Sequence, residues 1–161
     1  MKLCPKFLKG GNMNIINEMT LTFKALSENE GFARSAVAAF CIQLNPTLDE
    51  ITDIKTAVSE AVTNCVVHAY PKGTGNVSIN VKLSNSGAII TISDNGIGIP
   101  NFKQATQPFY TTKPKEERCG MGFTVMESFM DSVVLSKNGL SGLTVTMEKK
   151  FGEAEQEFIG G

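Results

Sequence analysis

Helical periodicity is clearest over residues 47–70 of this 161-residue chain. Apolar side chains recur there every three or four positions, which predicts one long amphipathic helix with a buried stripe. Thr47 and Glu50 form a capping-box pattern at its start. Ser27 and Glu30 repeat that pattern, so a second helix is expected to begin there and to run to about residue 43. The stripe of the long helix comprises Leu48, Ile51, Ile54, Val58, Ala61, Val62 and Cys65.

Apolar and polar residues alternate in three other segments. Residues 19–25 predict one strand, and residues 77–92 and 133–147 each predict a β-hairpin. A short helix is expected over 122–131, with four buried side chains: Phe123, Met126, Phe129 and Met130. This order of elements predicts an α/β fold, a two-layer sandwich in which helices cover one face of a mixed, mostly antiparallel sheet.

The two ends of the chain lack such patterns. Residues 1–13 are interpreted either as a disordered leader or as an upstream start artefact. The second interpretation arises because codons for Lys9-Gly10-Gly11 can spell a ribosome-binding sequence just before a second methionine, Met13. Residues 150–161 are expected to form a flexible acidic tail. The remaining segment, 14–149, is long enough for a single domain with one core.

Composition argues against several classes of protein. Lys and Arg total 15 against 16 Asp and Glu, and this near-neutral balance disfavours direct nucleic-acid binding. Its four cysteines form no C-x-x-C pair and it has one histidine, which argues against a zinc site and for a reducing compartment. No segment approaches the ~20 apolar residues of a membrane span, and no signal peptide is recognisable. We therefore expect a cytoplasmic protein without membrane partners.

Two polar residues lie one helical turn apart on the long helix, away from its apolar stripe. Glu60 and Asn64 place a carboxylate and an amide oxygen within about 6 Å of each other. Mg²⁺ prefers hard oxygen ligands and takes few of them from protein, so Asn64 is predicted to be a metal ligand and Glu60 a base. Taken alone, such a pair more often marks an ordinary solvated helix face.

Asp94 directly follows an expected buried strand and opens a turn with Gly96 and Gly98. A buried carboxylate accepts a hydrogen bond from the exocyclic amino group of adenine and repels the corresponding oxygen of guanine. The turn therefore predicts an adenine-binding site, although Asp-x-Gly-x-Gly by itself is a common turn sequence.

A second glycine motif opens the helix expected over 122–131. Gly120 and Gly122 flank Met121, and unpaired N–H groups at a helix start favour a phosphate that glycine allows to approach closely. Lys113 and Arg118 lie upstream, where they could reach a terminal phosphate. No Walker A sequence occurs, which excludes a P-loop.

In their order and spacing these motifs resemble the GHKL (Bergerat) ATP-binding superfamily of gyrase, Hsp90, MutL and histidine kinases. Three strings, at 59–64, 109–114 and 117–123, resemble more narrowly the bacterial anti-sigma serine kinases, above all the SpoIIAB-like anti-sigma F factors of sporulation. The likeness runs over 18–147 and implies that 14–149 is a GHKL ATP-binding kinase domain. Cys119 stands where the family has serine, so only backbone contacts are implied there.

The resemblance implies an ATP- and Mg²⁺-dependent protein-serine kinase that is also an anti-sigma factor. Its implied partners are sigma factor F, which it inhibits, a SpoIIAA-like anti-anti-sigma protein, which it phosphorylates, and a second copy in a homodimer. Glu60 and Arg118 take catalytic roles, and Arg34 matches an arginine of the partner-binding surface. The implied nucleotide-binding residues are Asn64 with its Mg²⁺, Asp94, Gly96, Gly98, Thr112, Lys113, Gly120, Met121, Gly122 and, near the adenine, Thr144.

Two other functions stay open from the residues alone. Glu60 could activate water in a stand-alone ATPase, or ATP could gate a sigma-binding module with little kinase activity. A histidine kinase is disfavoured, because the single histidine, His68, lies within the ATP-site helix rather than in a dimerisation helix.

Overall fold

The computed structural model describes residues 14–71, 73–99 and 122–152. Its strands are β1 (Ile15–Lys24), β2 (Asn76–Ser84), β3 (Gly87–Asp94), β4 (Ser132–Asn138) and β5 (Gly142–Lys150). Its helices are α1 (Glu28–Cys41), the 3₁₀ turn η2 (Ile42–Leu44), α2 (Leu48–Asn64), the π-helical turn η3 (Cys65–Ala69) and α4 (Gly122–Phe129). The expected leader and the segment 100–121 lie outside the described residues.

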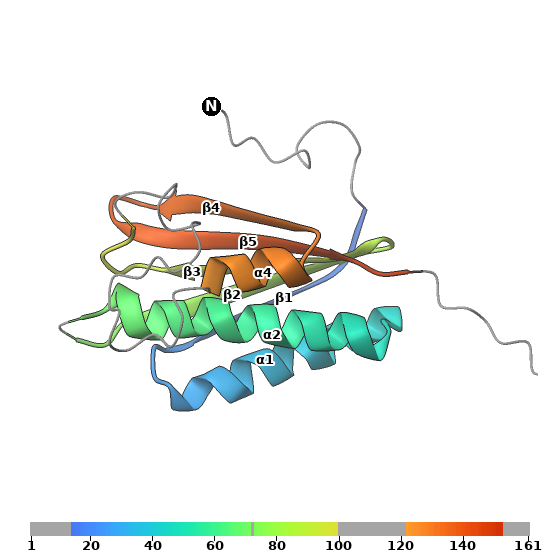
Figure 1. Ribbon diagram of the computed structural model, residues 1–161, viewed down its shortest axis with the longest axis horizontal. Coiled ribbons are helices and arrows are strands. Elements are labelled where there is room, and N and C mark those ends of the chain that lie inside the picture. The colour runs from blue at the N-terminus through green and yellow to red at the C-terminus, as the bar shows by residue number, and fades with distance from the viewer. Residues whose placement is uncertain (1–13, 72, 100–121, 153–161) are drawn as a thin grey trace, which may run out of the picture.

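The strands form one sheet in the order β1-β2-β3-β5-β4, and each pairing between them is antiparallel. Figure 1 shows α1, α2 and α4 together on one side of this sheet, with α2 between the other two. The predicted two-layer α/β fold is confirmed. A mixed sheet would contain at least one parallel pairing, whereas the described part of the chain has only antiparallel ones.

The core lies between the helices and the sheet. Alternate residues of the three inner strands point toward α2, which also packs against α1 and α4. The predicted stripe of α2 is buried or half-buried, except that Leu48 is 87% exposed. At 100° per residue Leu48 lies roughly 90° from the centre of the stripe, so its predicted burial was wrong.

The two expected capping boxes differ. At the start of α2, Glu50 N–H donates to Thr47 Oγ1 at 3.2 Å and Thr47 N–H donates to Glu50 Oε2 at 2.7 Å. At the start of α1, Ser27 already has helical dihedrals (φ −58°, ψ −31°) and its side chain makes no capping bond. Glu30 accepts hydrogen bonds from Arg34 instead, so the helix was predicted correctly and its cap was not.

The start of one strand and one side chain at the end of a helix also differ from expectation. β1 begins at Ile15 rather than at residue 19, because its pairing with β2 continues to Ser84. Phe129, expected in the core, is 37% exposed at the end of α4.

The beginning of the expected tail is held against the domain. Lys150 belongs to β5, and Phe151 packs on the core while its N–H donates to Ser86 O at 3.1 Å. Gly152 N–H donates to Glu50 Oε1 at 2.8 Å. The ordered domain therefore extends to at least residue 152, beyond the boundary of 149 that the sequence predicted.

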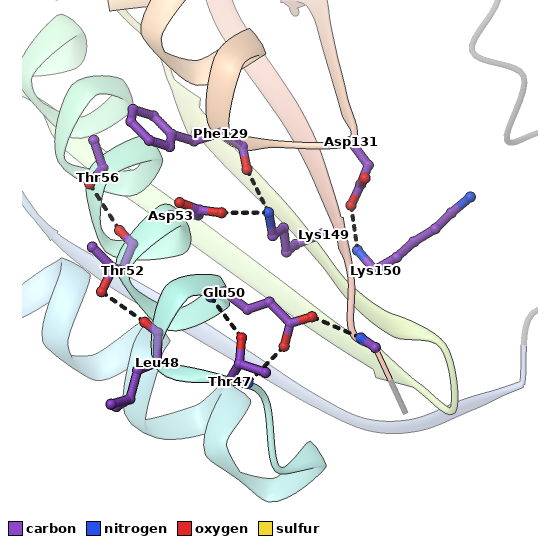
Figure 2. A network of polar contacts seen from close by, with 11 residues as sticks. Thr47, Leu48, Glu50, Thr52, Asp53, Thr56, Phe129, Asp131, Lys149 and Lys150 are labelled. Atoms are coloured by element: carbon purple, nitrogen blue, oxygen red, sulfur yellow. Dashed lines mark hydrogen bonds and ion pairs between the residues drawn. The ribbon is translucent and has the colours of Figure 1, made fainter. Parts of the chain in front are cut away.

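A lysine joins the sheet to both α2 and α4. Lys149 Nζ donates to Asp53 Oδ2 at 2.7 Å and to Phe129 O at 2.9 Å (Figure 2). The side chains of Lys149 and Asp53 are only 14% and 25% exposed, so solvent screens this ion pair less than a surface pair. Because Phe129 ends α4, the lysine also anchors the C-terminal end of that helix.

We expect Lys149→Met to lower the free energy of unfolding by about 1–3 kcal/mol, since it leaves a partly buried carboxylate and a helix-end carbonyl without their donor. Chemical denaturation measures the change. Lys24→Met is the matched control, because Lys24 is an exposed lysine of a strand, and it should change stability by less than about 0.5 kcal/mol. Equal effects of the two substitutions would contradict the anchoring role of Lys149.

Glu148 is an acid buried on the face of the sheet away from the helices. It is 6% exposed, and its Oε2 has no hydrogen-bond partner among the described residues. Burial disfavours its ionised form and raises the pKa of the carboxyl, with Asp131 adding to the effect and Lys150 opposing it. An unfolded chain ionises this group at a lower pH than the folded protein does. Glu148 therefore makes stability fall as pH rises from its ordinary pKa to its raised folded pKa.

The Glu148→Gln variant removes that penalty. We expect it to be more stable than the original protein at about pH 7, with the difference shrinking below about pH 4, where both states of the original carry a neutral acid. Denaturation midpoints across this pH range test the sign. Glu127→Gln, at an exposed position of α4, should show no such pH-dependent gain.

Candidate functional site

The first residue of α4 lies directly against the polar pair of α2. A Cβ atom on Gly122 would lie 3.2 Å from both Nδ2 and Oδ1 of Asn64 and 3.3 Å from Glu60 Oε2. A larger residue would crowd both side chains, so glycine permits this close approach. The fold thus brings together three of the residues predicted from the sequence to form one site.

Asn64 carries an unmet hydrogen-bonding capacity. It is 9% exposed, and its Nδ2 has no hydrogen-bond partner among the described residues. Leaving a buried polar group unpaired costs on the order of 1–3 kcal/mol, so such a group in a native fold calls for a functional explanation. Its position beside a carboxylate and a helix N-terminus indicates a ligand-binding site.

Asp94 ends β3 as a buried carboxylate, 3% exposed. Its Oδ1 accepts hydrogen bonds from Gly96 N–H at 2.9 Å and, more weakly, from Leu143 N–H at 3.4 Å. Cys65, the residue after Asn64, borders the carboxylate. Burial, and secondarily Asp94, raise the pKa of the Cys65 thiol well above its usual value, so the thiol stays neutral. The Asp94 and Asn64 regions therefore meet at one end of α2.

The turn that follows Asp94 packs between η3 and the hairpin of β4 and β5. A Cβ atom on Gly96 would lie 2.1 Å from Ala69 O, and Ile97 N–H donates to that same oxygen at 2.9 Å. Gly98 has a φ of +68°, and its Cβ would lie 1.8 Å from Ser141 O. Both glycines of the predicted adenine turn are thus required by close backbone contacts.

Thr144 does not face this site. It alternates with the core residues Leu143 and Val145, so its side chain lies on the other face of the sheet from theirs. On that face its hydroxyl lies 2.9 Å from the hydroxyl of Ser93. The adenine role predicted for Thr144 is therefore not supported, because strand alternation turns its side chain away. Leu143 N–H is the group of β5 that reaches Asp94.

Arg34 lies on the side of α1 that borders α2, with its side chain 43% exposed. Its Nη1 donates to Glu30 at 3.1 and 3.3 Å and to Ser59 Oγ at 3.4 Å, and Ser59 also donates to Glu30. Ser59 precedes Glu60 on α2, so the expected partner surface borders the candidate site. The remaining predicted site residues lie outside the described residues: Thr112, Lys113, Arg118, Gly120 and Met121.

Two residues that the sequence analysis did not select hold the turn after Asp94. Tyr70 Oη accepts a hydrogen bond from Asn95 N–H at 2.9 Å, and Asn138 Nδ2 donates to Asp94 O at 2.8 Å. In the sequence, Tyr70 is only the last residue of the helix expected over 47–70, and Asn138 is only one residue of the hairpin expected over 133–147. Neither pattern carries a signal of contact with a distant turn.

Within 14–71, 73–99 and 122–152, no group of three or more histidine, cysteine or acidic residues could hold a metal ion. That is compatible with Mg²⁺, which commonly takes only one or two ligands from the protein beside a bound phosphate. Over the same ranges, none of the helices is sufficiently long and apolar to cross a membrane.

Comparison with known proteins identifies the family to which this chain is similar. A family model described as a histidine kinase-like ATPase domain matches residues 23–149. The anti-sigma F factor of Bacillus licheniformis is 51% identical over 140 residues, which cover 86% of this chain and 96% of that protein. The anti-sigma F factor of Geobacillus stearothermophilus matches to the same extent. That of Clostridium kluyveri is 52% identical over 135 residues, covering 84% of this chain and 95% of that protein.

Gly96→Ala should abolish measurable ATP binding, because its methyl group overlaps Ala69 O and displaces the turn that carries Asp94. Gly31→Ala in α1 is the control: a Cβ there meets nothing within 4 Å, so binding should be unchanged. Calorimetric titration with ATP compares the two variants. Unaltered affinity of the Gly96 variant would contradict the tight packing of this turn.

Proposed function

This chain belongs to the histidine kinase-like ATPase family, with anti-sigma F factors among its relatives, and from this we propose that it is an anti-sigma factor with protein-serine kinase activity. It binds and inhibits sigma factor F. With ATP it phosphorylates a serine of a SpoIIAA-like anti-anti-sigma protein, which is thereby inactivated. The homodimer implied by the family resemblance stays a prediction.

The observation that carries the proposal is the buried Nδ2 of Asn64, which has no hydrogen-bond partner among the described residues, in a side chain that lies with Glu60 against Gly122. These groups fit a magnesium nucleotide. Asn64 Oδ1 is a hard oxygen ligand of the kind Mg²⁺ takes, its Nδ2 can donate to a phosphate oxygen, and Gly122 opens a helix whose first N–H groups favour an anion. A bound Mg²⁺ would neutralise charge on the transferred phosphate.

Glu60 is the proposed general base. Its carboxylate accepts the proton of the substrate serine as the hydroxyl oxygen bonds to the γ-phosphorus, and the bond from that phosphorus to the bridging oxygen of ADP breaks. Positioning and charge neutralisation supply most of the rate enhancement in such transfers. In the proposed site, Arg118 neutralises charge on the γ-phosphate, while Thr112, Lys113, Gly120 and Met121 complete the phosphate-binding segment, as the family resemblance implies.

The proposed base lies next to the surface proposed for the protein partners. Ser59 directly precedes Glu60 and shares hydrogen bonds with Glu30 and Arg34 of α1. A partner that contacts Arg34 would therefore lie near the candidate site. This proximity supports a partner-binding surface next to the candidate site.

Glu60→Gln tests the proposed base directly. We expect it to bind ATP with nearly unchanged affinity and to transfer phosphate to the anti-anti-sigma serine on the order of 10²- to 10⁴-fold more slowly. Labelled ATP with the purified partner gives the rate of transfer, and equilibrium titration gives the affinity. The matched control is Glu127→Gln, at an exposed residue of α4, which should transfer at the original rate.

The same assay separates the alternative functions. Phosphate release without a protein acceptor, at a rate that the acceptor does not change, would replace the kinase with a stand-alone ATPase. Nucleotide-dependent sigma binding without labelled serine would leave only a gated binding module. Equal transfer by the Glu60 and Glu127 variants would reject Glu60 as the base.

A further inference from the structure

We propose that the Tyr70 hydroxyl and the Asn138 side-chain amide are positioning residues that orient Asp94 toward the amino group of adenine and thereby set the base specificity of the site. This inference rests on the proposed ATP function. It concerns two residues that would not touch the nucleotide and would act through the turn at residues 94–98.

Tyr70 holds the turn from the helical side. It follows the π-helical turn η3, and its hydroxyl donates to Asn76 O at 2.7 Å while accepting from Asn95 N–H at 2.9 Å. Its ring occupies the space beside Gly75, where a Cβ atom would lie 2.0 to 2.6 Å from ring carbons. A hydroxyl that both donates and accepts has a defined direction, so Asn95 is fixed relative to the start of β2.

Asn138 holds the same turn from the hairpin side. Its Nδ2 donates both to Asp94 O at 2.8 Å and to Asn95 Oδ1 at 2.9 Å. Gly142, at the start of β5, brings the backbone so close that a Cβ atom there would lie 2.1 Å from Asp94 O. The backbone of residues 94–95 is therefore held between two elements far apart in the sequence.

The orientation of the Asp94 carboxylate follows from these contacts. Its Oδ1 accepts N–H groups from Gly96, within the turn, and from Leu143, within the hairpin. Two donors on one oxygen define the plane of the carboxylate and hence the direction of Oδ2. Because hydrogen bonds weaken steeply as their angle departs from linear, a small rotation of the turn would weaken recognition of an amino group.

The phosphate end of the site does not depend on these two residues. Glu60, Asn64 and Gly122 lie on α2 and α4, whereas the hydrogen bonds that define the roles of Tyr70 and Asn138 go to Asn76 and to the turn at 94–95. Loss of either positioning residue should therefore weaken base recognition without weakening the contacts to phosphate. A purely structural role would instead lower affinity for every nucleotide alike.

The test compares ATP with purine riboside triphosphate, which has hydrogen in place of the amino group, by calorimetric titration of the full chain. The original protein should prefer ATP by roughly 10-fold or more, since the contact is a hydrogen bond to a charged group. In Tyr70→Phe and in Asn138→Ala this preference should fall to about 3-fold or less, while affinity for the analogue changes by less than about 2-fold.

Two further variants calibrate the result. Asp94→Asn reports the preference that remains without the carboxylate. Asn80→Ala is the matched control for Asn138, because Asn80 donates to Glu18 at 2.7 Å from an inner strand, and it should keep the original preference. Thermal unfolding confirms that each variant is folded, and if one positioning variant fails to fold, the other decides.

Each outcome has one meaning. If the original protein prefers ATP and both positioning variants keep that preference, the inference is overturned while the proposed function stands. Equal losses of affinity for ATP and the analogue also overturn it, as a purely structural role. If the original protein does not distinguish the two nucleotides, the adenine site itself is rejected, and the inference falls with it.

Discussion

The buried carboxylate of Asp94 is the group around which the candidate site is organised. A carboxylate out of contact with water is costly unless it accepts hydrogen bonds, and its partners come from separate parts of the chain. The turn donates Gly96 N–H and strand β5 donates Leu143 N–H, while Cys65 of η3 borders the group. Satisfying this one acid therefore requires the turn, the C-terminal hairpin and the end of the helical layer to meet at one place.

Helix α2 links that junction to the chemistry of the site. One side of the helix is part of the core, while Glu60 and Asn64 face Gly122 at the start of α4. Lys149 holds the opposite end of α4 through Phe129 O and Asp53. The polar pair thus lies on a rigid element whose neighbour is anchored away from the site. Such support is what precise phosphoryl transfer requires, since small displacements of catalytic groups are costly.

How far sequence patterns predicted the structure depended on how local each interaction is. The capping box of Thr47 and Glu50 joins residues three apart, and both of its bonds form. The same pattern at Ser27 failed because Glu30 found partners in Arg34 and, across the helix interface, in α2. Thr144 was assigned to the adenine by motif likeness alone, whereas its place in the alternation of β5 turns its side chain to the other face of the sheet.

The sequence by itself determined the order of the main elements and the α/β sandwich, because periodicity and short motifs express interactions between neighbours in the chain. It also supplied the candidate site residues, which stay a proposal: Glu60, Asn64, Asp94, Gly96, Gly98 and Gly122. Their assembly was decided by tertiary structure. Which glycine meets Asn64, which N–H groups satisfy Asp94, and how Tyr70 and Asn138 hold its turn depend on contacts between distant segments. Those contacts exist only after the helices have packed on the sheet, since packing alone fixes the distances between them.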